Sequence, residues 1–126
     1  MNVHITVPMV PPSPNERKWQ HHMARFRLRK AWQEGLFYGV ICARHRRELI
    51  DQAKTNRMRV EITVHIKNTF DEDNLVAAMK PVLDGLKKLG YIRDDSPEFL
   101  ELVLPIQQIK SAERKTVLKI GPVGNE

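Results

Sequence analysis

Two short acidic runs are the residues of this 126-residue chain whose types and spacing best suit chemistry. Asp71, Glu72 and Asp73 directly follow a strongly alternating segment, and Asp94 and Asp95 follow the next segment of helical pattern. A strand-to-helix loop and the loop after that helix can both lie at one edge of a sheet. We therefore expect two to four of these carboxylates to converge.

Converging carboxylates repel one another unless a cation lies between them. Ligand sets made only of oxygen suit Mg²⁺, with Mn²⁺ as an alternative. Mg²⁺ held by a few carboxylates, with several waters still bound, is the usual apparatus of phosphoryl chemistry, where it activates water and neutralises developing charge. The acidic runs therefore favour a metal site for phosphoryl chemistry, without a small-molecule cofactor.

Each run also has a purely structural interpretation. Asp73 or Asn74 can cap the helix that follows, with Glu72 near its positive end. Residues 94–97, Asp-Asp-Ser-Pro, can be a simple turn. The metal interpretation gains support because the two runs flank one predicted helix in a chain that also has a basic half.

Lys80 lies inside that predicted helix, four residues before Asp84 and on the same face. The two side chains can form an ordinary surface ion pair. The lysine can instead be held near a bound phosphate.

Positive charge is concentrated in residues 17–59, which hold twelve Lys or Arg and three acids, whereas the whole chain has a net charge of +6. A basic half beside a carboxylate-rich half suggests a polyanionic partner, although a solvated basic helix explains the charge equally well. The candidate DNA-binding residues are Arg17, Lys18, Arg25, Arg27, Arg29, Lys30, Arg44, Arg46 and Arg47.

Hydrophobic periodicity predicts four strands, at 3–7, 58–67, 100–106 and 116–120. It predicts helix over 18–53, split or bent because of Gly35 and Gly39, and over 74–89, kinked at Pro81 and ended by Gly90. The order β-α-β-α-β-β indicates an α/β (α+β) fold, with a single mixed sheet of about four strands packed against helices. The apolar stripe expected along the first helical stretch comprises Trp19, Met23, Phe26, Trp32, Leu36 and Val40.

The length predicts one domain over residues 1–126. The longest apolar run, residues 36–43, is too short to cross a bilayer, and the first residues lack the basic stretch of a signal peptide. Cys42 is the only cysteine, which excludes an internal disulfide. We therefore expect a soluble, cytoplasmic protein with no membrane partner.

Three motifs together resemble the core signature of the RusA family of Holliday-junction resolvases, which are of phage and prophage origin. They are Asp-Glu-Asp-Asn-Leu at 71–75, Lys-Pro-Val-Leu-Asp-Gly-Leu at 80–86 and Gly-Tyr-Ile-Arg-Asp-Asp-Ser-Pro at 90–97. The stretch from Val7 to Asn15, with Pro-Pro-Ser at 11–13, is similar to the family's opening strand and loop. The resemblance covers most of the chain, is loosest over residues 18–57 and keeps the order of the motifs.

This resemblance implies a homodimeric, Mg²⁺-dependent endonuclease that cleaves four-way DNA junctions in recombination and repair. It implies that Asp71, Asp73 and Asp95 are the essential carboxylates and metal ligands, with Asp94 assisting. It also maps the family's helix lysine onto Lys80, whereas Asn74 and Asp84 have supporting places in the same motifs.

The chain departs from the better-known members just before Lys80. Residues 76–79 intervene between the Asn-Leu pair and this lysine, about one extra helical turn. Two alternatives therefore accompany the nuclease hypothesis. One is a DNA junction-binding protein without nuclease activity, and the other is a nuclease for flaps, RNA or another branched substrate.

Overall fold

The computed structural model describes residues 2–13 and 21–124 of the chain. Three residues of our predictions lie outside this part of the chain: Trp19 of the apolar stripe, and Arg17 and Lys18 among the DNA-binding residues. The elements in order are β1 (Val3–Val7), α1 (His22–Gly39), α2 (Ala43–Thr55), β2 (Met58–Ile66), α3 (Glu72–Ala78), α4 (Lys80–Leu89), β3 (Leu100–Leu102), β4 (Gln107–Lys110) and β5 (Lys115–Pro122).

The strands form one mixed sheet, which confirms the predicted α+β class. Its order is β1-β5-β2-β3, and β4 also pairs with β2. β5 runs antiparallel to both β1 and β2, whereas β3 and β4 run parallel to β2. The sheet has five strands rather than about four. Of the strand predicted over 100–106 only Leu100–Leu102 (β3) forms, and Pro105, which has no N–H to donate to a ladder, lies in the gap that follows. β4 begins beyond the predicted end, at Gln107, and pairs with the end of β2 as β3 does with its beginning.

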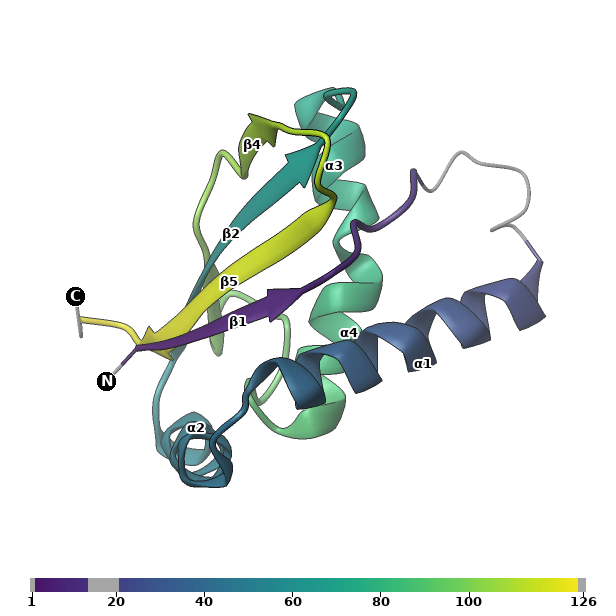
Figure 1. Cartoon of the computed structure of the whole chain (residues 1–126). Helices are drawn as coiled ribbons and strands as arrows, with labels where there is room; N and C mark the ends of the chain where they lie inside the picture. The colour runs from purple at the N-terminus through teal and green to yellow at the C-terminus, as the bar shows by residue number, and fades with distance from the viewer. Residues whose placement is uncertain (1, 14–20, 125–126) are drawn as a thin grey trace.

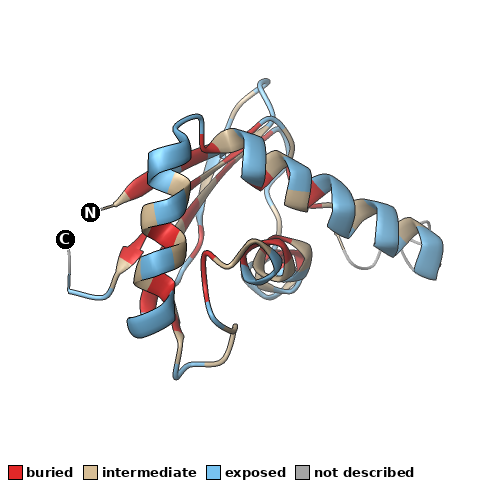
Figure 2. Ribbon diagram, turned by 90° about the horizontal axis from the view of Figure 1, so that it is seen from below, coloured by how far each residue is buried: buried red, intermediate tan, exposed pale blue. Residues whose placement is uncertain are grey.

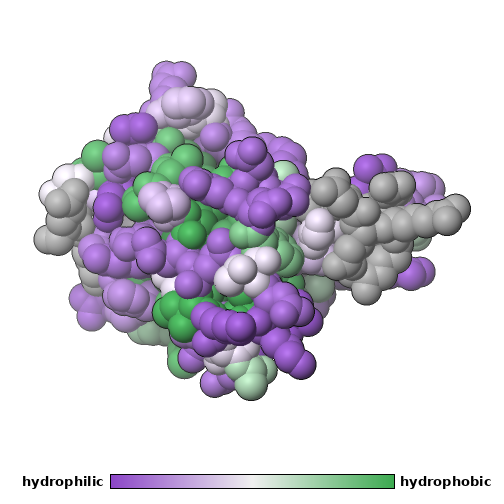
Figure 3. Space-filling model, turned by 90° about the horizontal axis from the view of Figure 1, so that it is seen from above, coloured by the Kyte–Doolittle hydropathy of each residue, from purple (hydrophilic) through white to green (hydrophobic). Residues whose placement is uncertain are grey.

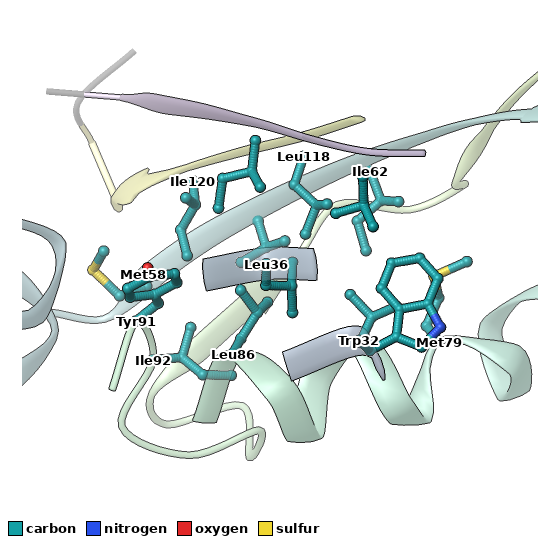
Figure 4. Packing of buried hydrophobic residues seen from close by; sticks show 14 of the residues in the cluster. Trp32, Leu36, Met58, Ile62, Met79, Leu86, Tyr91, Ile92, Leu118 and Ile120 are labelled. Carbon is teal, nitrogen blue, oxygen red and sulfur yellow. The ribbon is translucent and has the colours of Figure 1, made fainter. Parts of the chain in front are cut away.

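The helices cover one face of this sheet (Figures 1 and 2). Alternate residues of β1 and β2 are buried, as expected for strands with a single covered face. Trp32 and Leu36 of α1, Met79 between α3 and α4, and Leu86 of α4 point toward Ile62, Leu118 and their neighbours on the sheet (Figure 4). This packing sets α1 and α4 beside each other above the sheet.

The first predicted helical stretch is split into two helices after Gly39, which confirms one of the two predicted outcomes, whereas Gly35 does not interrupt α1. α1 continues through Gly35 and ends at Gly39, and α2 starts only at Ala43. A Cβ on Gly39 would lie 2.6 Å from Cγ2 of Ile5 and 3.1 Å from the carbonyl oxygen of Thr6. The glycines therefore let α1 lie directly against β1.

The helix predicted over 74–89 is instead two helices, and its start was predicted too late. α3 begins at Glu72 with Asp71 as its N-cap, so neither Asp73 nor Asn74 is the cap. The chain then breaks at Met79, and Pro81 is the second residue of α4, where its missing N–H costs no intrahelical bond. Gly90 ends α4 with a φ of 82°, as predicted.

The first turns of α1 extend beyond the sheet and are largely exposed (Figure 2). Met23 and Phe26 of the predicted apolar stripe are 43% and 52% exposed, so this part of the stripe is not buried. The reason is that the sheet below α1 reaches only as far as Trp32 and Leu36, which are fully buried. None of the helices in the described part of the chain could span a membrane.

Candidate functional site

A groove runs between α1 and α4 on the surface of the molecule. It consists of two adjoining hollows of about 280 and 710 Å³, which share Arg29 and Asp84 as lining residues. The smaller hollow has an apolar floor that includes Leu28 and Pro81. The cationic residues that line the two hollows together are Arg25, Arg29, Lys30, Lys80, Lys87 and Lys88.

The close approach of the two helices makes this groove. A Cβ on Gly85 of α4 would lie only 2.8 Å from Cδ1 of Leu36 on α1, so the Leu36 side chain packs directly against the backbone of α4. Arg25 and Arg29 are four residues apart on α1, and Lys80, Asp84 and Lys87 follow one another on α4 at spacings of four and three residues. Helical periodicity thus gathers the cations along one line.

Lys80 links the helix to the second acidic run. Its Nζ lies 3.2 Å from Oδ1 of Asp84 and 3.5 Å from Oδ2 of Asp95. The hydrogen bond to Asp84, together with that carboxylate's charge and Asp95, raises the pKa of Lys80 above its usual value. The predicted Lys80–Asp84 pair is confirmed, and it extends to a third residue that the sequence spacing did not indicate.

Asp94 and Asp95 lie along α4 and are held by its lysines. The backbone N–H of Asp95 donates to Oδ1 of Asp94 at 2.9 Å, and Nζ of Lys87 is 3.7 Å from the same oxygen. Burial acts to raise the pKa of Asp95, but hydrogen bonding to Asp94 and the charges of Lys80 and Lys87 hold it below the ordinary value. Asp95 is therefore ionised under ordinary conditions.

Asp71, Glu72 and Asp73 form the exposed beginning of α3. The side chain of Asp71 makes no capping hydrogen bond, although the residue occupies the N-cap position. The end of the molecule that carries α3 and β4 is mostly hydrophilic, with hydrophobic side chains in separate patches (Figure 3). The first acidic run is thus available to solvent and ligands.

Three of the predicted carboxylates do not come together. Within residues 2–13 and 21–124, no three His, Cys, Asp or Glu side chains form a group that could hold a metal ion. Asp94 and Asp95 pair with lysines of α4, whereas Asp71 is the N-cap of α3 and Asp73 lies in its first turn. These described residues therefore hold no cage of three carboxylates.

The donor chemistry of the first run nevertheless suits Mg²⁺. Asp71 and Asp73 supply hard carboxylate oxygens from one exposed turn. Mg²⁺ commonly takes only one or two protein carboxylates when phosphate oxygens and waters complete its shell. These two residues fit that use, and participation of Asp94 and Asp95 stays a prediction.

The predicted DNA-binding residues divide into several groups. Arg25, Arg29 and Lys30 line the groove, but Arg27 lines a separate hollow of about 750 Å³ on α1. The three arginines of α2 lie elsewhere. Arg44 pairs with Glu48 at 3.3 Å, Arg46 donates to the carbonyl of Val40 and lies over the Phe37 ring, and Arg47 is exposed.

Lys87 and Lys88 are groove residues that our list of DNA contacts omitted. They fall outside the basic stretch 17–59, so overall charge distribution did not reveal them. The strongly amphipathic pattern of residues 80–89, with both lysines opposite the apolar stripe, was the available signal.

No protein-family model and no curated protein matches this chain. The resemblance to the RusA family therefore stands on the three motifs of residues 71–97.

Proposed function

We propose that this chain binds branched DNA through the α1–α4 groove and cleaves it as a Mg²⁺-dependent endonuclease, resolving four-way junctions. The single observation that carries this proposal is the groove itself. Among the residues that the structure describes, six Lys or Arg side chains line it against one acid, Asp84, and it reaches the Lys80–Asp95 pair.

The groove suits the DNA backbone rather than its bases. Lys and Arg side chains neutralise phosphates and release condensed counterions, which gives affinity without sequence information. Arg25 and Arg29 present planar guanidinium groups that can hold a phosphate by two hydrogen bonds. The protein therefore recognises the form of the DNA mainly through the placement of these charges.

Asp71 and Asp73 would hold Mg²⁺, which when bound supplies an activated water and offsets charge on the phosphodiester. Lys80 has a distinct role at the end of the groove. Its side chain is 66% exposed, so its ammonium can turn from Asp84 to a phosphate oxygen at small cost. There it would stabilise the negative charge that develops during cleavage.

A homodimer follows from the proposed substrate. Symmetric cleavage of a four-way junction needs two active sites, and a two-fold axis supplies them with matching geometry. The partners would thus be a second copy of this chain and one branched DNA molecule.

One observation favours a second candidate, a junction-binding protein without cleavage. Asp95 is paired with Lys80, and no three carboxylates of the described residues form a metal-binding group. If this arrangement persists on DNA, the groove alone gives a binding protein.

Asp73→Asn separates the two functions. The change keeps the shape of the side chain and removes a charged ligand, so we expect cleavage of a four-way junction in Mg²⁺ to be lost and binding to be kept or tightened. Gel-shift and cleavage assays on one junction measure both, with Glu72→Gln, from the same exposed turn, as the matched control. Wild-type protein that binds the junction but never cuts it, nor flaps nor RNA, in Mg²⁺ or Mn²⁺ would establish the second candidate.

A further inference from the structure

A glutamine on β4 binds the backbone directly before the first acidic run. Oε1 of Gln108 accepts a hydrogen bond from the N–H of Phe70 at 2.8 Å, and Nε2 of Gln108 donates to the carbonyl of Phe70 at 3.0 Å. Both bonds are partly buried. The side-chain amide thus satisfies both polar groups of one residue at once.

The sheet sets the position of this glutamine. Gln108 is opposite Val64 in the parallel β2–β4 pairing. Directly after β4, the N–H of Ser111 donates to the carbonyl of Ile66 at the end of β2. Beyond Ile66 the chain leaves the ladder and reaches Phe70 without a strand partner. Gln108 therefore continues the sheet's hydrogen bonding past the end of β2, through its side chain rather than its backbone.

The two hydrogen bonds between Gln108 and Phe70 lie next to the residues that the proposed function needs. Phe70 is followed at once by Asp71, whose carbonyl accepts the N–H of Leu75 as α3 begins. The backbone of Asp71 is thus held on one side by the Phe70–Gln108 bonds and on the other by the first turn of α3. The side chains of Asp71 and Asp73 stay exposed, so their placement depends on this backbone.

We propose that Gln108 is a positioning residue that places Asp71 and Asp73 for metal binding. This inference rests on the proposed function and adds a residue outside the three recognisable motifs. Gln108 acts through the Phe70 peptide and does not itself touch the phosphate. The strand neighbour Gln107 is exposed and makes no such bonds among those that the structure describes.

The test compares Gln108→Met with Gln107→Met. Methionine matches glutamine in length but cannot form either bond to Phe70, so the change removes the bonds and keeps the bulk. Hydrogen exchange of the Phe70 amide by NMR reports the bonds, and Mn²⁺ titration followed by electron paramagnetic resonance reports metal binding without DNA. Gln108→Asn, whose amide is one methylene shorter, is the second variant should the methionine variant fold poorly.

We expect faster exchange at Phe70 and metal affinity about 10–100-fold weaker in the Gln108 variant, the usual range for residues that orient metal ligands. Junction binding in EDTA should match that of Gln107→Met. Wild-type Mn²⁺ affinity together with wild-type cleavage in Gln108→Met would overturn the inference. Wild-type protein that binds no Mn²⁺ and cuts no DNA would instead overturn the proposed function, and the role of Gln108 with it, even if Phe70 stays protected.

Discussion

At the scale of single residues, Lys80 connects the groove to the second acidic run. Its ammonium lies within 3.5 Å of carboxylate oxygens of both Asp84 and Asp95, yet the side chain is 66% exposed. Exposed ion pairs contribute only about 0–1 kcal/mol to stability, because solvent screens them and the side chains lose entropy. Lys80 can therefore exchange these partners for DNA without weakening the fold.

Replacing Lys80 tests whether it serves the chemistry or only the surface. A well-placed charge that stabilises a transition state is worth roughly 2.7–4 kcal/mol. We expect Lys80→Ala to slow single-turnover junction cleavage roughly 10²–10³-fold, with a small effect on binding and a stability loss below about 1 kcal/mol. An unchanged rate would reduce Lys80 to a surface ion pair and would contradict its mapping from the RusA motif.

The ionisation of Asp95 gives an independent test of the same cluster. Hydrogen bonding to Asp94 and the charges of Lys80 and Lys87 hold the pKa of Asp95 below its ordinary value, despite the opposing effect of burial. A lowered carboxyl pKa in the folded state adds stability above about pH 4, and this is lost as the pH falls through the lowered pKa. We expect Lys80→Met to raise the pKa of Asp95 toward its ordinary value, as measured by carboxyl ¹³C NMR titration. A pKa that does not move would show that Lys80 and Asp95 are not paired in solution.

At the scale of elements, the position of α1 depends on glycines that face its neighbours. Gly39 faces Ile5 and the backbone of Thr6 on β1, whereas Gly85 of α4 faces the end of the Leu36 side chain. Strand backbone cannot move aside as a leucine methyl group can. The two contacts therefore have different tolerance for a larger residue.

Alanine substitutions should reveal this difference. Overpacking commonly costs about 1–3 kcal/mol, while replacing glycine by alanine inside a helix gains up to about 1 kcal/mol. We expect Gly39→Ala to lower the free energy of unfolding by about 1–3 kcal/mol and Gly85→Ala to change it by less than about 1 kcal/mol. Urea denaturation measures both, and a larger loss in Gly85→Ala would show that the α1–α4 contact, not α1–β1, is the tight one.

At the scale of the whole molecule, the fold converts a diffuse basic character into one groove. The predicted basic stretch 17–59 contributes Arg25, Arg29 and Lys30, and α4 contributes the other three cations from a separate part of the chain. α2, which carries three further arginines, lies toward the end of the sheet where β1 begins (Figure 1). The groove, rather than the basic stretch as a whole, should determine how DNA binding depends on salt.

Salt titrations of paired variants test this distribution. Each phosphate contact that is lost reduces the magnitude of the negative slope of log affinity against log salt by about one. We expect the double variant Lys87→Gln with Lys88→Gln to reduce the magnitude of this slope by about two. The double variant Arg44→Gln with Arg47→Gln on α2 should leave the slope nearly unchanged. Equal effects of the two pairs would place the DNA on α2 as well and would remove the groove as the principal binding surface.

Periodicity in the sequence was sufficient to predict the class of the fold. The alternation of apolar residues in β1, β2 and β5 has the period of a strand with one covered face, and these strands appear with nearly the predicted bounds. The predicted pairing of Lys80 with Asp84 also holds, because residues four apart in a helix are neighbours whatever the rest of the chain does. Such features depend only on local geometry.

Only the tertiary structure decided which distant residues meet. The turn at 91–97 brings Asp95 to Lys80 at the start of α4, and no three carboxylates of the described residues form one group. The α1–α4 crossing adds Lys87 and Lys88 to the basic groove, and β4 brings Gln108 to the peptide before Asp71. None of these contacts follows from local periodicity alone, because each depends on how separate elements pack on the sheet.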